Sequence, residues 1–222
     1  MGIFDKFRSY REDKQRDTAE RYGTKLKTVL TTKDDRLEAI ESLRKMQPEI
    51  AIPQLIKRFE MVVDHAIQDM REKELVCEIL LEHKDVSKPH VREALTRARH
   101  IGWPIKLAER IFSQDEFLDL LIDNMKDNTV EFDEIGLDRN IEIMLALKDI
   151  QHEKIVPKAL PFLKTRDDNL RMAAVECLEA QGETSAQARA AIIELAKEQS
   201  NDDNSRFMGL VKGIVQRHNW TA

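Results

Sequence analysis

The sequence has few of the residues on which β-sheet, disulfide-bonded and membrane proteins depend. Its 222 residues include seven glycines and six prolines, too few for the many turns of an all-β fold. Aromatic residues make up 5%, and no segment alternates apolar and polar residues over the length of a strand. No apolar run approaches the roughly 18 residues that a membrane-spanning helix needs. These absences favour an all-α protein that does not cross a membrane.

Cysteine is equally scarce. Cys77 and Cys177 are the only two, and each lies in an apolar helical pattern, which predicts buried free thiols. Free thiols are typical of a reducing compartment. Near the N-terminus, Asp5, Lys6 and Arg8 interrupt the hydrophobic stretch that a secretory signal requires. We therefore expect a cytoplasmic protein.

The overall charge is slightly acidic, with a net value of -5 and a pI near 5.8. A protein that holds nucleic acid by its phosphates needs an excess of Lys and Arg. The balance therefore argues against nucleic acid as a partner, although it leaves room for a local basic patch.

What the sequence does contain is charge and helical periodicity. Charged residues are 35% and hydrophobic residues 41%, and the hydrophobic ones recur with the three- and four-residue spacing of amphipathic helices. A charged leader over 1–30 precedes a repeat domain over 31–222. In that domain we expect about five antiparallel helix pairs and a last capping helix, in the segments 34–59, 66–83 with 88–101, 104–112 with 114–126, 137–149 with 153–164, 168–180 with 184–198, and 203–218.

Two prolines predict particular helix boundaries. Lys88-Pro89 follows Ser87, a pattern that indicates a helix start. Pro161 falls deep in the 153–164 segment, where we expect it to bend or shorten the helix.

The leader is itself amphipathic. Ile3, Phe4, Phe7 and Tyr10 fall on one helical face, with basic residues around the rest. Three interpretations are open: a cap over the first helix pair, a helix that docks on a partner, and a membrane-surface helix formed by residues 1–14.

A five-residue motif occurs twice, 35 residues apart. Its copies are Asp-Asp-Asn-Leu-Arg at 167–171 and Asp-Asp-Asn-Ser-Arg at 202–206, and each opens an apolar helical run. A looser copy lies near the N-terminus, where the segment Arg36–Leu43 matches Arg171–Leu178. A period in the thirties indicates stacked helical units rather than one closed core.

These elements resemble HEAT repeats. In that family the first helix of a pair carries an Asp near its start, an Arg in its first turn, then Ala and Leu, and the second helix carries a Pro before a Leu. The matching positions here are Asp35, Arg36, Ala39 and Leu43, then Asp168, Arg171, Ala174 and Leu178, and the segments Ile52-Pro53-Gln54-Leu55 and Val156-Pro157-Lys158-Ala159-Leu160. The resemblance is good over 34–59 and 153–198, fair over 202–218 and weak over 60–127. It implies a right-handed α-solenoid that serves as an extended binding surface.

In such an array the Asp and Arg side chains have a structural role. We expect each Asp to cap a helix start and each Arg to bridge to the Asp of the neighbouring repeat. The residues to which this role is assigned are Asp35, Arg36, Asp168, Arg171, Asp203 and Arg206.

No group of residues predicts catalysis or metal binding. The six histidines are scattered, none forms H-E-x-x-H, and neither cysteine has a partner at metal spacing. There is no Gly-rich phosphate loop. A partial calcium-loop pattern beginning at Asp123 has Met125 where an oxygen ligand is needed. We expect no catalytic residue, no metal and no cofactor.

The charges are unevenly distributed along the middle of the chain. Residues 84–110 hold seven Lys and Arg against three acidic residues, whereas residues 113–138 hold nine acidic residues against one Lys. Within the basic stretch, a stripe opposite the apolar helix face consists of Arg92, Thr96, Arg99 and Trp103. Arg and Trp most often dominate interface energies, so the stripe predicts a docking surface for an acidic protein. The alternative is a solvated face, with Trp103 packed under the next repeat.

The leading functional hypothesis is a non-enzymatic scaffold or adaptor for protein–protein interaction. Two other HEAT-like classes are open. One is an alkylpurine DNA glycosylase, whose basic groove is at odds with the acidic residues over 113–138. The other is a phycobilin lyase or related chaperone, for which the sequence offers no evident chromophore-handling residues.

Overall fold

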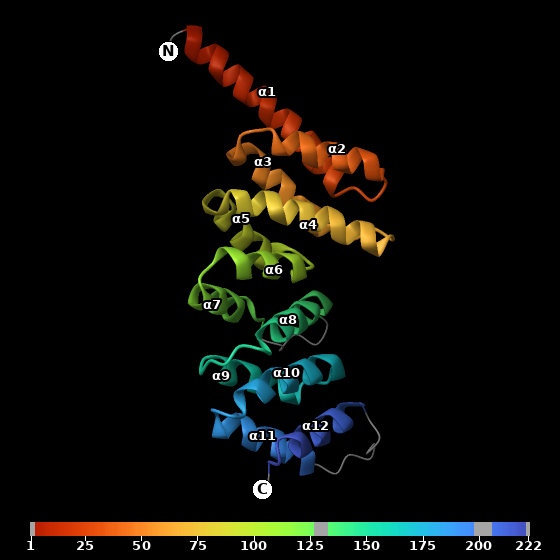
Figure 1. Cartoon of the computed structure of the whole chain (residues 1–222), viewed down its shortest axis with the longest axis vertical. Helices are drawn as coiled ribbons and strands as arrows, with labels where there is room; N and C mark the ends of the chain where they lie inside the picture. The colour runs from red at the N-terminus through yellow and green to blue at the C-terminus, as the bar shows by residue number, and fades with distance from the viewer. Residues whose placement is uncertain (1–2, 127–132, 198–205, 221–222) are drawn as a thin grey trace. The chain divides into compact units, whose positions relative to one another are not determined.

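Helices make up all the regular structure in the described part of this computed structural model. The structure describes residues 3–126, 133–197 and 206–220, and within them the side chains of Tyr10 and of residues 12 onward. These ranges contain α-helices and two 3₁₀ segments and no strand (Figure 1). The all-α prediction is therefore confirmed.

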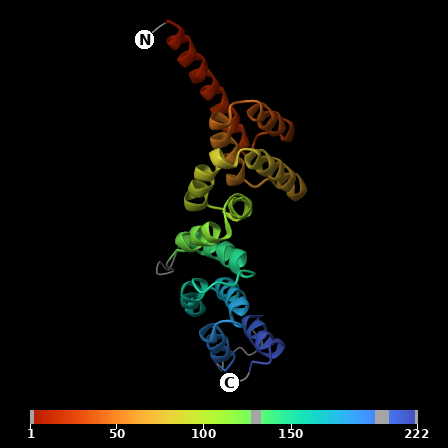
Figure 2. The ribbon, with the colours of Figure 1, turned by 60° about the vertical axis from the view of Figure 1, so that its left-hand side comes forward.

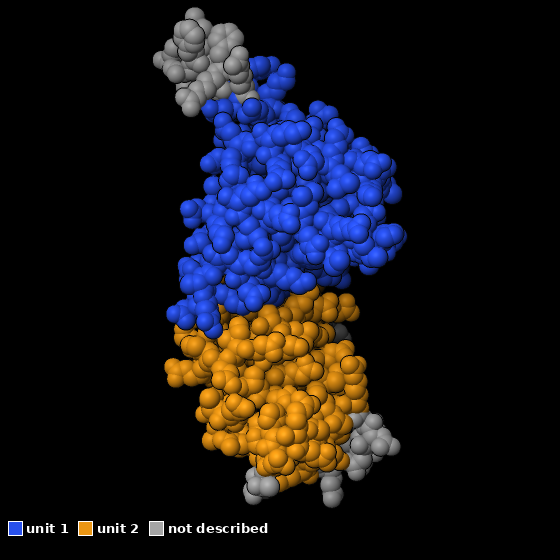
Figure 3. Space-filling model, in the orientation of Figure 1, with its two compact units in different colours: residues 1–117 blue, residues 118–222 orange. Residues whose placement is uncertain are grey.

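The chain divides into two compact units, Met1–Phe117 and Leu118–Ala222, and the division falls inside α7 (Figure 3). Unit 1 contains α1 (Ile3–Leu26), α2 (Lys33–Arg44), α3 (Pro48–Leu55), η1 (Ile56–Glu60), α4 (Ala66–Glu82), α5 (Lys84–Arg97), α6 (Gly102–Ile111) and the start of α7 (Gln114–Asn124). Unit 2 contains the rest of α7, α8 (Glu134–Leu147), α9 (Ile155–Ala159), η2 (Leu160–Lys164), α10 (Asp168–Gln181), α11 (Ala186–Lys197) and α12 (Arg206–Arg217).

In unit 1 the first helices of successive pairs pack on one another. α4 lies between α2 and α6, while α3 packs against α2, α4 and α5 (Figures 1 and 2). The apolar side chains that the helical periodicity places inward form this core. Ile40, Leu43, Leu55 and Leu80 are among those with no exposed surface.

The leader forms α1, which packs against α2 and α3. Its contact surface is its C-terminal half, where Ala19 and Leu26 are fully buried. The predicted apolar face of Ile3, Phe4 and Phe7 consists of side chains outside the described ones, and Tyr10 is 66% exposed.

In unit 2 α10 is the central helix. It packs against α8 and α12, and also against α9, η2 and α11. Leu170, Ala174 and Leu178 on α10 have no exposed surface, like Leu147 on α8 and Ile214 on α12.

Prolines break the second helix of one pair in each unit. α3 contains Pro53 and changes to the 3₁₀ segment η1 at Ile56, and α9 changes to η2 at Leu160, just before Pro161. Proline lacks the N–H group that an α-helical turn needs. The expected shortening at Pro161 is confirmed.

The expected start of a helix at Lys88-Pro89 is wrong. α5 begins at Lys84 and contains Pro89 in its interior. The Ser87 hydroxyl does not cap α5, because it donates to the Leu80 carbonyl oxygen at 2.8 Å, at the end of α4. Pro89 is the sixth residue of α5, and because it has no N–H it cannot donate to the Asp85 carbonyl, so the helix continues through one missing hydrogen bond.

The capping residues also differ from those predicted. Asp35 does not cap α2, because Thr32 precedes the first helical residue and accepts from the Asp35 N–H at 3.2 Å. The Thr32 hydroxyl also donates to the Asp35 carboxylate at 2.7 Å. Asp168 is itself the first residue of α10, and the cap is Asp167, which accepts from the Leu170 N–H at 2.8 Å. The Asp203 prediction lies outside the described residues.

The thiols agree with the sequence prediction. Cys77 and Cys177 are buried and free, and burial raises the pKa of each to about 12. Such thiols are poor nucleophiles at neutral pH.

Among the described helices none combines the length and the apolar character that crossing a membrane requires.

Candidate functional site

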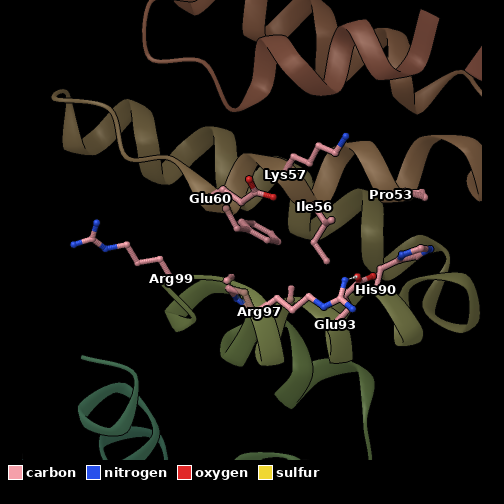
Figure 4. Close-up of a pocket in the computed structure, with 12 residues that line it drawn as sticks. Pro53, Ile56, Lys57, Glu60, His90, Glu93, Arg97 and Arg99 are labelled. Carbon is pink, nitrogen blue, oxygen red and sulfur yellow. Dashed lines mark hydrogen bonds and ion pairs between the residues drawn. The ribbon is translucent and has the colours of Figure 1, made fainter. Parts of the chain in front are cut away.

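A groove of about 560 Å³ lies in unit 1 between η1 and α5 (Figure 4). We call it the η1–α5 groove. The residues that line it are Pro53, Ile56, Lys57, Phe59, Glu60, His90, Glu93, Ala94, Arg97, Ala98, Arg99 and Pro104. Side chains from η1 form one wall and side chains from α5 the opposite wall, so both helix pairs contribute.

The floor of the groove is apolar and aromatic. Phe59 is almost fully buried and stacks on the half-buried Trp103, with ring centroids 6.1 Å apart and planes 5° from parallel. The ammonium group of Lys106 lies over the Trp103 ring, 4.7 Å from its centroid. Stacked aromatic pairs are worth about 0.5–1.5 kcal/mol beyond their burial, so this contact helps to hold Phe59 in place.

Charged side chains of both signs surround this floor, with Lys57, Arg97 and Arg99 against Glu60 and Glu93. Arg97 forms an exposed ion pair with Glu93 at 2.6 Å, and Lys57 donates to the side-chain oxygen of Gln54 at 2.6 Å. Arg99 is exposed and has no ion pair with any described residue. Figure 4 shows it at one end of the groove, with its guanidinium directed away from the other labelled side chains.

The structure separates the four residues of the predicted stripe. Arg99 lines the groove, and Trp103 packs on its floor through Phe59. Arg92 lies elsewhere, 3.5 Å from Glu116 and with its guanidinium 4.7 Å from the Phe112 centroid. The Thr96 hydroxyl donates within its own helix, to the Arg92 carbonyl at 3.0 Å.

Glu116 is already engaged by its own turn. Hydrogen bonds from the backbone N–H and the hydroxyl of Ser113 lower the pKa of the Glu116 carboxyl, and nearby Lys88 and Arg92 add to this. Arg92 is therefore paired within the chain, and Arg99 is the arginine of the stripe that is available to a partner.

A buried ion network fixes the position of η1. The Arg58 side chain has no exposed surface, and its Nε and one Nη lie 2.8 Å from Glu72 and 2.7 Å from Asp69. Its other Nη donates to the Met61 carbonyl at 2.9 Å. Arg36 from α2 reaches the same Glu72 at 2.8 Å, and Lys73 pairs with Asp69 at 2.7 Å. Because Arg58 lies between Lys57 and Phe59, this network sets the orientation of the groove wall.

The carboxylates of the network remain charged despite their burial. Burial alone would raise the pKa of Glu72, but hydrogen bonds from Arg36, Gln68 and Arg58 hold it below its usual value. Burial would likewise raise the pKa of Asp69. Hydrogen bonds from Lys73, Arg58 and the Val63 N–H lower this pKa below its usual value. Burial also lowers the pKa of Lys73.

The predicted bridging role of the repeat arginines needs correction. Arg36 does bind the neighbouring pair, but its partner is Glu72 because Asp69 is held by Arg58 and Lys73. Arg171 pairs with Asp168 of its own helix at 3.4 Å, and its guanidinium lies 3.8 Å from the Phe207 centroid. Arg206 is exposed at the start of α12.

The sequence prediction missed the opposite wall and the network. Ile56, Phe59 and Glu60 follow the Pro53 motif that the repeat pattern identified, but the 3₁₀ turn that aims them at α5 had no sequence signal that we recognised. Asp69, Glu72 and Lys73 share the helical register of the buried Val76 and Leu80, but their charged side chains gave no signal that these positions are buried.

The groove suits recognition of an extended segment. It offers an apolar floor, an aromatic corner and exposed cations. In the ranges that the structure describes, no three His, Cys, Asp or Glu side chains are placed to hold a metal ion. Comparison of the chain with protein-family models, curated proteins and solved structures found no match.

Proposed function

We propose that the chain is a non-enzymatic scaffold or adaptor that binds an acidic segment of a partner protein. Its helix pairs form a right-handed α-solenoid of the HEAT type, and its location is cytoplasmic. Support for the solenoid comes from the repeated motifs and from the packing of α4 between α2 and α6 and of α10 between α8 and α12. The buried, free thiols support a reducing compartment.

The docking site of this proposal is the η1–α5 groove. One observation carries it: Arg99 is exposed, has no ion pair with a described residue, and stands at the end of a groove whose lining includes Phe59, the ring that stacks on Trp103. A cation beside a preformed apolar groove matches a ligand that combines carboxylates with a large apolar side chain. Arg and aromatic residues are also those enriched in interface hot spots.

The test uses random peptides displayed on phage and selected against the full chain at low ionic strength. We expect the selected peptides to be acidic and to carry a large apolar residue. Their affinity should fall as salt rises, because charge attraction between exposed groups is screened. Arg99→Glu should weaken binding at least about fivefold, the factor that corresponds to an interface residue worth more than 1 kcal/mol.

The matched control is Arg71→Glu, an equal charge reversal at an exposed position of unit 1 outside the groove. It should change affinity by less than about twofold, through the long-range field alone. Selection of no acidic peptides, or equal losses in the two variants, would refute this function. Circular dichroism of both variants establishes that they are folded.

A further inference from the structure

Unit 2 contains a groove made from the same parts as the η1–α5 groove. It lies between η2 and α11, and its volume is about 1050 Å³. On its first wall, Pro157, Leu160 and Leu163 have the same spacing in the sequence as Pro53, Ile56 and Phe59. In both walls an α-helix gives way to a five-residue 3₁₀ segment directly after the proline motif.

The opposite walls also correspond. Ala191, Glu194 and Leu195 on α11 line this η2–α11 groove with the same spacing as His90, Glu93 and Ala94 on α5. Each of the two walls thus places an acidic residue beside an apolar one, across from the 3₁₀ segment.

The charges around the η2–α11 groove have the same sign as those around the first. Lys164, Arg166 and Arg171 line it against the single carboxylate of Glu194. Lys164 is exposed, has no ion pair with a described residue, and occupies the position on the 3₁₀ wall that Glu60 occupies in the first groove. The unpaired cation therefore comes from the 3₁₀ wall in this groove and from Arg99, beyond the end of α5, in the first groove. Arg171 is less available, because it pairs with Asp168 and stacks on Phe207.

We propose that the η2–α11 groove is a second docking site for an acidic, extended protein segment, so that one chain binds two such segments. This rests on the proposed function, because it extends the same recognition chemistry to the second unit. The occupant is a protein segment rather than a small anion, since a groove of about 1050 Å³ lined by Leu160, Leu163 and Leu195 has room for apolar side chains beside a charged one.

The two sites differ in their apolar preference. The first is lined by the aromatic ring of Phe59, whereas the second has Leu163 at the equivalent position and a larger volume. We expect the second groove to select larger or aromatic side chains, which fill more of its space. A partner whose two acidic segments carry different apolar residues should therefore bind both grooves better than a partner with two identical segments.

The experiment disables the first groove and asks what the chain still binds. Random peptides on phage are selected in parallel against the wild-type chain and against the full chain that carries Lys57→Glu and Arg99→Glu. We expect acidic peptides from both selections. Peptides from the double variant should lose at least about fivefold in affinity when Lys164→Glu is added, and less than about twofold when Lys158→Glu is added instead. Lys158 is an exposed residue of α9 outside the groove.

Isothermal titration gives a second readout. Wild-type chain should simultaneously take up one wild-type-selected peptide that is sensitive to Arg99→Glu and one peptide selected on the double variant, and these two peptides should not compete. If acidic peptides bind the wild type but none is selected on the double variant, the second site is refuted and the proposed function stands. The second site is also refuted, again without loss of the proposed function, if the peptides from the double variant are insensitive to Lys164→Glu. If neither chain selects acidic peptides, the proposed function fails as well.

Discussion

The Nε of Arg36 and a carboxylate oxygen of Glu72 lie 2.8 Å apart, and both side chains are almost fully buried. The same oxygen accepts from Nε of Arg58, also at 2.8 Å. One carboxylate therefore joins an arginine from α2 to an arginine from η1, and it does so from α4. In a medium of low polarity this arrangement holds only while every charge is compensated.

Removing the charge at the centre of this network should destabilise unit 1. Glu72→Gln keeps the size of the side chain but leaves two buried guanidinium groups facing a neutral amide. Breaking a buried ion pair in this way typically costs about 3–5 kcal/mol. Urea unfolding followed by circular dichroism measures the loss.

Glu82→Gln is the matched control, because Glu82 pairs with Arg44 at 2.6 Å on the surface, where both side chains are close to half exposed. Exposed pairs contribute about 0–1 kcal/mol. A loss at Glu72 no larger than at Glu82 would show that the network is not a stabilising element.

The same network predicts that stability depends on pH. The pKa values of Asp69 and Glu72 are lower in the folded protein than in the unfolded chain. Their contribution is complete above the pKa of the unfolded carboxyls and is lost as the pH falls through the lower, folded values. We expect the urea midpoint to fall steadily on acidification below about pH 5. In Glu72→Gln the midpoint should fall less steeply, and an identical pH profile would contradict the assignment.

Most helix positions could be predicted from the sequence because apolar residues recur at helical spacing over every described pair. The buried charges could not be assigned in this way. Asp69 and Glu72 share the inward register of Val76, but a pattern that recognises buried positions by apolar side chains takes them for solvent-facing ones. Only the approach of Arg36 and Arg58 in space explains them, and no local signal encodes a partner 36 residues away.

The candidate site was predicted in part for a similar reason. The sequence placed Arg92, Thr96 and Arg99 on one face of a single helix, but α5 ends at Arg97. Arg92 and Thr96 therefore belong to α5, whereas Arg99 lies beyond its end. What the register could not indicate is which of them meets a second helix pair. Arg92 meets Glu116 and Phe112, whereas Arg99 stands beside the wall that the 3₁₀ turn at Ile56 creates.

The capping geometry predicts an order between two adjacent aspartates. Asp167→Ala removes the acceptor for the Leu170 N–H and should cost about 0.5–2 kcal/mol. Asp168→Ala removes an exposed carboxylate from the first turn, where the attraction to the helix dipole is worth about 0.3–1 kcal/mol. Thermal unfolding of the two variants compares them. The opposite order would mean that α10 begins one residue later.

Leu178 should be among the most sensitive positions of unit 2. It has no exposed surface on α10, the helix against which most of the unit packs. Replacement by Ala should cost about 2–5 kcal/mol, because both transfer energy and a cavity are involved. Leu145→Ala is the control, since Leu145 is 42% exposed on α8 and should lose less than half as much. Comparable losses at the two positions would exclude the core assigned to unit 2.

Gly182 should be required for the docking of the C-terminal tryptophan. A Cβ atom at this position would collide with the Trp220 ring and lie 3.2 Å from the Glu179 carbonyl oxygen. The ring is held in place by stacking on His218, with centroids 4.7 Å apart. The backbone N–H of Trp220 also donates to the Val215 carbonyl oxygen at 3.0 Å. Gly182→Ala must therefore displace the Trp220 ring from the end of α10 or strain the backbone around residue 182.

Fluorescence in a Trp103→Phe background reports this displacement, because Trp220 is then the only tryptophan. We expect Gly182→Ala to shift its emission to longer wavelength and to cost about 1–3 kcal/mol, as overpacking does. Gly209→Ala is the matched control: an added Cβ there meets nothing within 4 Å, so it should leave the emission unchanged and stabilise α12 by up to about 1 kcal/mol. In a Trp220→Ala chain the penalty of Gly182→Ala should shrink, because the ring that causes it is absent. A penalty that persists undiminished in that chain would assign the cost to the Glu179 carbonyl instead of the ring.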